Sequence, residues 1–105
     1  MRIAVDVQVS QYSIVILKYE GHTVIQAEPG ELDKQFFIRI KDFNADLYVS
    51  PDYDWMNYAL DNNRLFLQIR SGWDRKRVKN EILSFIKREE KLPKKERFLH
   101  LQDKV

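Results

Sequence analysis

The 105-residue chain contains no cysteine, and glycine and proline occur only three times each. Without cysteine, neither a disulfide framework nor a thiolate metal site can form. With so few glycines the chain lacks the glycine-rich loops that cradle phosphates, and it has no serine-centred nucleophile elbow. These absences disfavour nucleotide-binding enzymes and hydrolases that use an activated serine or cysteine.

Long hydrophobic runs are also missing. No eighteen consecutive residues are apolar, and Asp6 interrupts the first apolar run, so we expect neither a signal peptide nor a membrane span. Hydrophobic residues make up 44% and charged residues 32% of the chain, as in ordinary globular domains. A chain of this length buries roughly two-thirds of its unfolded surface. The sequence therefore predicts one cytosolic domain with one core.

Charge is unevenly distributed along the chain, although the net charge is only +2. Residues 1–63 hold five lysines and arginines against ten aspartates and glutamates, whereas residues 64–105 hold thirteen against six. An acidic part beside a basic part suits a protein that holds cations in one place and polyanions in another. A merely solvated basic helix and tail is the plainer alternative.

Strand-like and helix-like runs alternate along the chain. Strands are expected within 2–9, 23–27, 46–50 and 64–69, and helices over 10–20, 33–43, 55–61 and 74–90. The segment 10–20 is rich in β-branched residues and a strand is conceivable there, but a helix is favoured by Ser10 at its start and Gly21 after its end. Such a helix would have Tyr12, Ile16 and Tyr19 on one face.

The alternation predicts an α/β fold with three layers, α/β/α, around a short, mainly parallel sheet of four or five strands. The last helix shows the clearest amphipathic pattern, with Val78, Ile82, Phe85 and Ile86 on its apolar face. We expect the domain to span residues 1–92. The basic tail, residues 93–105, would follow it and could add an edge strand through 97–101.

Four aspartates fall where strands end or helices begin. Asp6 ends the first strand, Asp33 opens a helix, and Asp52 and Asp54 follow the third strand. The carboxyl ends of parallel strands share one edge of the sheet, so we expect these carboxylates to gather there. Clustered carboxylates repel one another unless a hard divalent cation such as Mg²⁺ or Mn²⁺ neutralises them. Helix capping is the alternative explanation for Asp33 and Asp54.

The order and spacing of several short motifs resemble the small PIN-like proteins described as toxin-associated nucleases. The matching segments are Ile3-Ala-Val-Asp6, Gly21-His22-Thr-Val24, Leu32-Asp33 and Ser50-Pro-Asp52-Tyr-Asp54-Trp55. The resemblance covers residues 1 to about 70. The chain departs from the family pattern after the first aspartate, where it has Val7-Gln8 and the family usually has Glu-Asn.

The resemblance implies a metal-dependent nuclease, in particular an endoribonuclease. Asp6, Asp33, Asp52 and Asp54 would be catalytic, and Asp6, Asp52 and Asp54 would bind Mg²⁺ or Mn²⁺, which activates water and stabilises the phosphate in metal-assisted cleavage. The basic part of the chain would hold the RNA backbone through Arg70, Arg75, Lys76, Arg77 and Lys79. Tyr53, Trp55 and Trp73 are candidates for stacking on unpaired bases.

Two alternatives follow from the same residues. Val7 and Gln8 favour a catalytically inactive PIN-like binding module that engages RNA, an antitoxin or another protein, in a toxin–antitoxin or phage–host setting. The other alternative is a small regulatory subunit that forms a homodimer through the helix 74–90. Neither His22 nor His100 is expected to be catalytic, because His22 follows the helix-ending Gly21 and no metal-ligand spacing includes either residue.

Overall fold

The computed structural model describes residues 1–91. The predicted basic tail, its edge strand and His100 lie outside the described residues. The elements, in chain order, are β1 (Arg2–Val5), α1 (Gln11–Tyr19), β2 (Thr23–Gln26), α2 (Asp33–Arg39), the 3-10 turn η1 (Lys41–Phe43), β3 (Leu47–Ser50), α3 (Tyr53–Asp61), β4 (Leu65–Gln68) and α4 (Arg75–Glu90).

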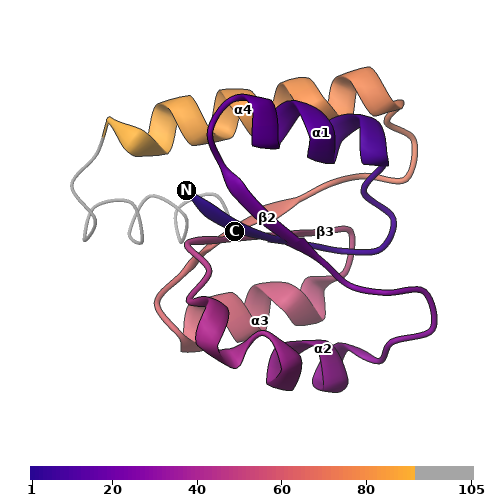
Figure 1. Ribbon diagram of the computed structural model, residues 1–105, viewed down its shortest axis with the longest axis vertical. Coiled ribbons are helices and arrows are strands. Elements are labelled where there is room, and N and C mark those ends of the chain that lie inside the picture. Colours follow the sequence, from indigo (N-terminus) through magenta and orange to yellow (C-terminus); the bar gives the residue numbers. More distant parts are fainter. Residues whose placement is uncertain (92–105) are drawn as a thin grey trace.

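All strand pairs within this part of the chain are parallel. The four strands lie in the order β2-β1-β3-β4, with Val5 opposite Gln26 on one side and opposite Val49 on the other. Figure 1 shows α1 and α4 over one face of this sheet and α2 and α3 over the other. The predicted fold class, a three-layer α/β/α domain around a short parallel sheet, is confirmed.

The two faces of the sheet bury different kinds of side chain. Ala4, Tyr48 and Phe66 lie in register on neighbouring strands and therefore point to the same face. Tyr48 makes edge-on ring contacts with Trp55 and Tyr58 of α3, so this face meets α2 and α3. We call the stacked rings here the aromatic layer, which consists of Phe36, Phe37, Tyr48, Trp55 and Tyr58. Burial raises the pKa of the Tyr48 hydroxyl to about 12.

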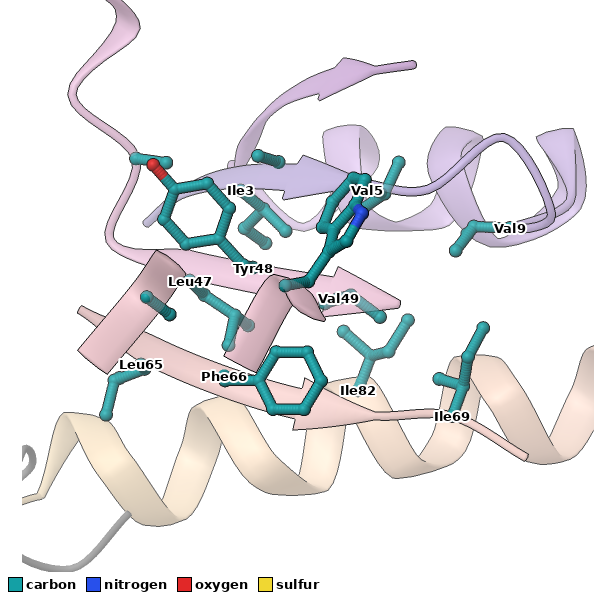
Figure 2. Close-up of a cluster of buried hydrophobic side chains, with 14 of the residues drawn as sticks. Ile3, Val5, Val9, Leu47, Tyr48, Val49, Leu65, Phe66, Ile69 and Ile82 are labelled. Carbon is teal, nitrogen blue, oxygen red and sulfur yellow. The ribbon is translucent and has the colours of Figure 1, made fainter. Parts of the chain in front are cut away.

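The opposite face is aliphatic. The alternation of strand side chains turns Ile3, Val5, Leu47, Val49 and Leu65 toward α1 and α4. From the helices, Ile14 and Leu17 of α1 and the four apolar residues predicted for α4 are buried beside them. We call this set, in which Phe85 is the one aromatic member, the aliphatic layer. Figure 2 shows Ile82 of α4 in one buried cluster with side chains of this face, such as Val49, and with Tyr48 and Phe66 of the other face.

Helix α1 forms where a helix was predicted, but the face predicted from Tyr12, Ile16 and Tyr19 is not the face that is buried. Ser13, Ile14 and Leu17 are buried, whereas Tyr19 is 89% exposed. Apolar residues occur nearly all around this segment, so packing against α4 selects the face and the spacing alone does not.

Two predicted boundaries are also wrong. The segment 33–43 is not one helix, because α2 ends at Arg39 and η1 closes at Asn44, which adopts a left-handed conformation (φ 57°) that asparagine tolerates well. Helix α3 begins at Tyr53, two residues earlier than predicted, and Asp52 caps it. Among the helices within residues 1–91, none is both long and apolar enough to cross a membrane.

Candidate functional site at the carboxyl edge of the sheet

The chain reverses its direction across the sheet between β1 and β3, and the residues that follow these strands form the core of the candidate site. Outward from β1 the chain first adds β2, then crosses back to β3 and β4. In open parallel sheets, ligands bind outside the carboxyl ends of the strands at such a switch point. Asp6 follows β1 and Ser50 ends β3, so these two residues flank the switch point.

Asp6 is nine-tenths buried and Ser50 is fully buried. The Ser50 hydroxyl donates to Oδ2 of Asp6 at 3.1 Å, and the Gln8 backbone N–H donates to Oδ1 at 3.0 Å. Both carboxylate oxygens therefore accept hydrogen bonds from the protein. Hydrogen bonds to a charged acceptor stabilise a fold by about 1.5–3 kcal/mol each, which compensates the burial of this aspartate.

A relay of hydrogen bonds continues from Ser50 into α3. The Ser50 hydroxyl oxygen accepts from the backbone N–H of Asp52 at 3.0 Å, and Oδ1 of Asp52 accepts from the N–H of Asp54 at 2.9 Å. Asp52 thus caps α3, and Asp54 occupies the first turn, where a carboxylate is favourable. The relay fixes the backbone at the end of β3 and uses the Asp52 side chain for helix capping.

On the other side of Asp6, Gln26 holds the loop that follows β1. Its side-chain amide donates to the backbone carbonyls of Val9 at 2.7 Å and Asp6 at 3.2 Å. Arg39 donates to the Gln26 carbonyl at 2.9 Å and pairs with Glu31 through two hydrogen bonds. This pairing lowers the pKa of the Glu31 carboxyl to about 2. The loop carrying Asp6 is therefore tied to β2 and α2.

The four predicted aspartates do not assemble into a metal site. Asp33 is the first residue of α2, and Asp52 and Asp54 are exposed at the start of α3. Within residues 1–91, no group of three or more histidines, aspartates and glutamates is placed to hold a metal ion. Because Asp6 also accepts two hydrogen bonds from the protein, the residues present do not fit a resident Mg²⁺ or Mn²⁺ in this conformation.

The predicted cations lie around the start of α4. Arg70, Arg75, Lys76 and Arg77 are exposed and Lys79 is half-buried. Two aromatic side chains lie among them. The Arg75 guanidinium is 4.9 Å from the centroid of the Tyr12 ring, and that of Arg77 is 4.6 Å from the centroid of the Trp73 ring. We call the surface around the start of α4 the α4 basic face; its members are Tyr12, Trp73, Arg75, Lys76, Arg77 and Lys79. Arg75 and Lys79 lie on the side toward Tyr12 of α1, and Arg77 lies on the side toward Trp73.

Two carboxylates, those of Asp74 and Glu81, lie beside the α4 basic face. Oδ1 of Asp74 accepts from the Arg77 backbone N–H at 2.8 Å and so caps α4. The Arg77 side chain also lies 3.8 Å from Glu81, an exposed pair that holds the arginine only weakly. The cations of the α4 basic face therefore stay available to an anionic partner.

The remaining expectations concern other parts of the molecule. The apolar side of α4 is buried on the sheet, so a homodimer through this helix would have to use its polar side. His22 precedes β2, whose first residue pairs with Arg2 at the start of β1. It therefore lies at the amino edge, away from the site. Burial is the main cause that lowers its pKa.

Three residues with clear roles at the carboxyl edge of the sheet were not predicted from the sequence to be functional. They are Ser50, Gln26 and Tyr12. Ser50 could have been noticed as a hydroxyl at the end of a buried strand. Gln26 could have been noticed as a polar side chain at the end of the second strand. Nothing in the sequence predicts that Tyr12 lies under Arg75, because the two residues are 63 positions apart and meet only through the packing of α1 on α4.

Comparison of the chain with protein-family models, with curated proteins and with solved structures finds no significant match in any of the three. The resemblance to PIN-like proteins therefore stays a prediction from the quoted motifs. The functional argument rests on the geometry of the carboxyl edge and of the α4 basic face.

Proposed function

We propose that the domain is a binding module for single-stranded RNA that uses the α4 basic face. The observation that carries the proposal is the pairing of cations with aromatic rings on two sides of the start of α4, with Arg75 over Tyr12 and Arg77 over Trp73. Cations attract the phosphate backbone, and aromatic rings stack on unpaired bases. Tyr12 and Trp73 are half-buried, so each offers only part of its ring for stacking. This combination favours a single strand over a duplex, whose bases are already stacked on one another.

Rigid presentation of these side chains also supports the proposal. Cation–π contacts contribute about 0.5–1 kcal/mol each at exposed sites and restrict the motion of the arginines. The polar relay at Asp6, Ser50 and Asp52 fixes the carboxyl edge from which α4 begins. Binding of this kind needs no metal, because the protein supplies the positive charge.

Metal-dependent cleavage of RNA is the second candidate. It is favoured by one observation, the burial of Asp6 at the switch point of the sheet, because a buried carboxylate at such a position is a common feature of active sites. It requires the side chains of Asp33, Asp52 and Asp54 to leave their present positions. The first candidate requires no rearrangement.

Fluorescence anisotropy with a labelled single-stranded RNA in EDTA tests the first candidate. We expect the double variant Arg75→Gln/Arg77→Gln to bind the RNA about tenfold more weakly than wild type. A plot of the log association constant against log salt concentration should become less steep by about 1.4, since each lost phosphate contact removes about 0.7 from the steepness. The matched control is Lys34→Gln/Lys41→Gln, which removes the same charge on the α2 side. Equal losses in both variants, or no binding by the wild type, would contradict the proposal.

Incubation with a mixed RNA pool, with and without Mn²⁺, tests the second candidate. Wild type, Asp6→Asn and Asp52→Asn are compared. Cleavage that needs Mn²⁺ and is lost in both variants would support the nuclease. Binding in EDTA without cleavage would identify the inactive module, and equal cleavage by all three proteins would reveal a contaminating nuclease.

A further inference from the structure

A small pocket lies beside the α4 basic face, at the carboxyl ends of β3 and β4. Its volume is about 290 Å³, and its lining residues are Pro51, Tyr53, Gln68, Ile69, Arg70 and Ser71. This volume is at the lower end of the range for small-molecule sites, about 300–1,000 Å³. A pocket of this size suits a ligand as small as one nucleotide.

The lining has three kinds of surface. Ile69 is 5% exposed and contributes apolar surface, while the Tyr53 ring is 59% exposed and available for stacking. Arg70 supplies an exposed cation, and no carboxylate is among the lining residues. An aromatic ring and one cation in a small pocket favour a flat ligand that carries a negative charge.

The polar side of the pocket is held in place. The Gln68 side-chain amide donates to the carbonyl oxygen of Pro51 at 3.2 Å, which joins the ends of β4 and β3. The Ile69 backbone N–H donates to the carbonyl of Ser50 at 3.2 Å and continues the pairing of these strands. The pocket is therefore formed by strand ends rather than by a free loop.

The pocket and the α4 basic face are parts of one surface. The Trp73 backbone N–H donates to the Arg70 carbonyl at 3.0 Å, which closes a four-residue turn. The Cα atoms at the two ends of such a turn are less than about 7 Å apart. Arg70 lines the pocket and Trp73 lies under Arg77, so a strand bound along α4 would reach the pocket within about one nucleotide.

We propose that this pocket takes one unpaired nucleotide of the bound RNA strand, with the base stacked on Tyr53 and the phosphate at Arg70. The inference rests on the proposed RNA-binding function and adds to it a site for a single base. The α4 basic face supplies most of the affinity for the backbone. The pocket strengthens the dependence of binding on bases beyond what stacking on Tyr12 and Trp73 supplies.

The test compares oligouridine of about eight nucleotides with an abasic ribose-phosphate strand of the same length, both measured by anisotropy in EDTA. Wild type should prefer the strand with bases by about tenfold or more. Tyr53→Leu should lose several-fold of this preference, and Tyr53→Phe should keep it. Arg70→Gln should weaken both strands alike.

Matched controls come from the opposite edge of the molecule. Tyr19→Leu removes an exposed tyrosine at the end of α1, and Arg88→Gln removes an exposed arginine in the last turn of α4. Neither should change the preference. If wild type binds through Arg75 and Arg77 but Tyr53→Leu keeps the full preference for bases, the pocket assignment is overturned and the RNA-binding function stands. If the wild type binds neither strand, both the pocket assignment and the proposed RNA-binding function are contradicted.

Discussion

The two helical layers of this domain are built from different side chains and present different chemistry to solvent. The aromatic layer under α2 and α3 stacks rings closely, with Phe37 and Tyr58 parallel at 3.9 Å between centroids. The aliphatic layer is covered by α1 and α4, and outside it the start of α4 carries cations that lie over aromatic rings. We therefore assign stability mainly to the aromatic layer, and the proposed RNA binding to the surface outside the aliphatic layer.

The largest expected effect concerns the aromatic layer. Trp55 is fully buried and contacts Phe36, Phe37 and Tyr48. Trp55→Ala should lower the free energy of unfolding by about 3–5 kcal/mol, because it removes the largest buried side chain and leaves a cavity. Urea denaturation followed by circular dichroism measures the loss.

A milder variant in the other layer sharpens this comparison. Ile82→Val should cost about 1 kcal/mol and leave RNA binding unchanged. Trp55→Phe, which keeps a ring, should lie between the two. If Trp55→Ala were no worse than Ile82→Val, the assignment of stability to the aromatic layer would be wrong.

The next effect concerns Asp6, which faces the aromatic layer at its carboxyl edge. Asp6→Ala removes the acceptors of Ser50 and Gln8, and we expect it to lower the free energy of unfolding by about 2–3 kcal/mol. Asp6→Asn keeps one acceptor and should cost about 1 kcal/mol.

Thermal melts of both Asp6 variants, with and without Mn²⁺, check this prediction. Ligand binding to the native state alone would raise the melting temperature. We expect no rise that depends on Asp6. Higher stability of Asp6→Ala in the absence of metal would instead indicate that the native carboxylate is a strained, functional group.

The smallest effect concerns Glu31, which ties α2 to the end of β2 through Arg39. Its pKa is lowered from 4.5 to about 2, so its contribution to stability is complete above about pH 4.5 and is lost as the pH falls toward 2. Glu31→Gln should be less stable than wild type by under about 1 kcal/mol at neutral pH.

A pH series of thermal melts checks this prediction. The difference between wild type and Glu31→Gln should shrink below about pH 4.5 and vanish only below about pH 2, where the Glu31 carboxyl is protonated in the folded protein as well. A difference that grows on acidification would mean that Glu31 has no ionic role.

The fold was predictable because the chain alternates apolar strands with helices that have clear start signals. Asp74 before α4 is such a signal, and its side chain accepts a hydrogen bond from the helix it caps. At α3 the capping residue is Asp52, whereas the sequence favoured Asp54 as the cap. The end of α2 was not predictable from periodicity, because Ile40 and Phe43 continue the apolar spacing beyond Arg39. The turn there depends on the left-handed conformation of Asn44.

The site was predictable only as a location. Asp6 and Asp52 follow neighbouring strands, and both lie at the expected edge of the sheet. Which way a carboxylate points depends on the nearest backbone donors, and the Asp52 side chain turns toward the N–H of Asp54. Contacts between distant segments, such as Tyr12 with Arg75, depend on helix packing that the sequence does not encode locally.

The most direct test of the central claim is a map of amide chemical-shift changes on adding single-stranded RNA to the full chain in EDTA. The account predicts that the largest changes lie at Tyr12, Trp73, Arg75 and Arg77, with few changes on α2. Changes centred on Lys34 and Lys41, or changes at Asp6 and Asp52 that appear only when Mg²⁺ is added, would contradict it.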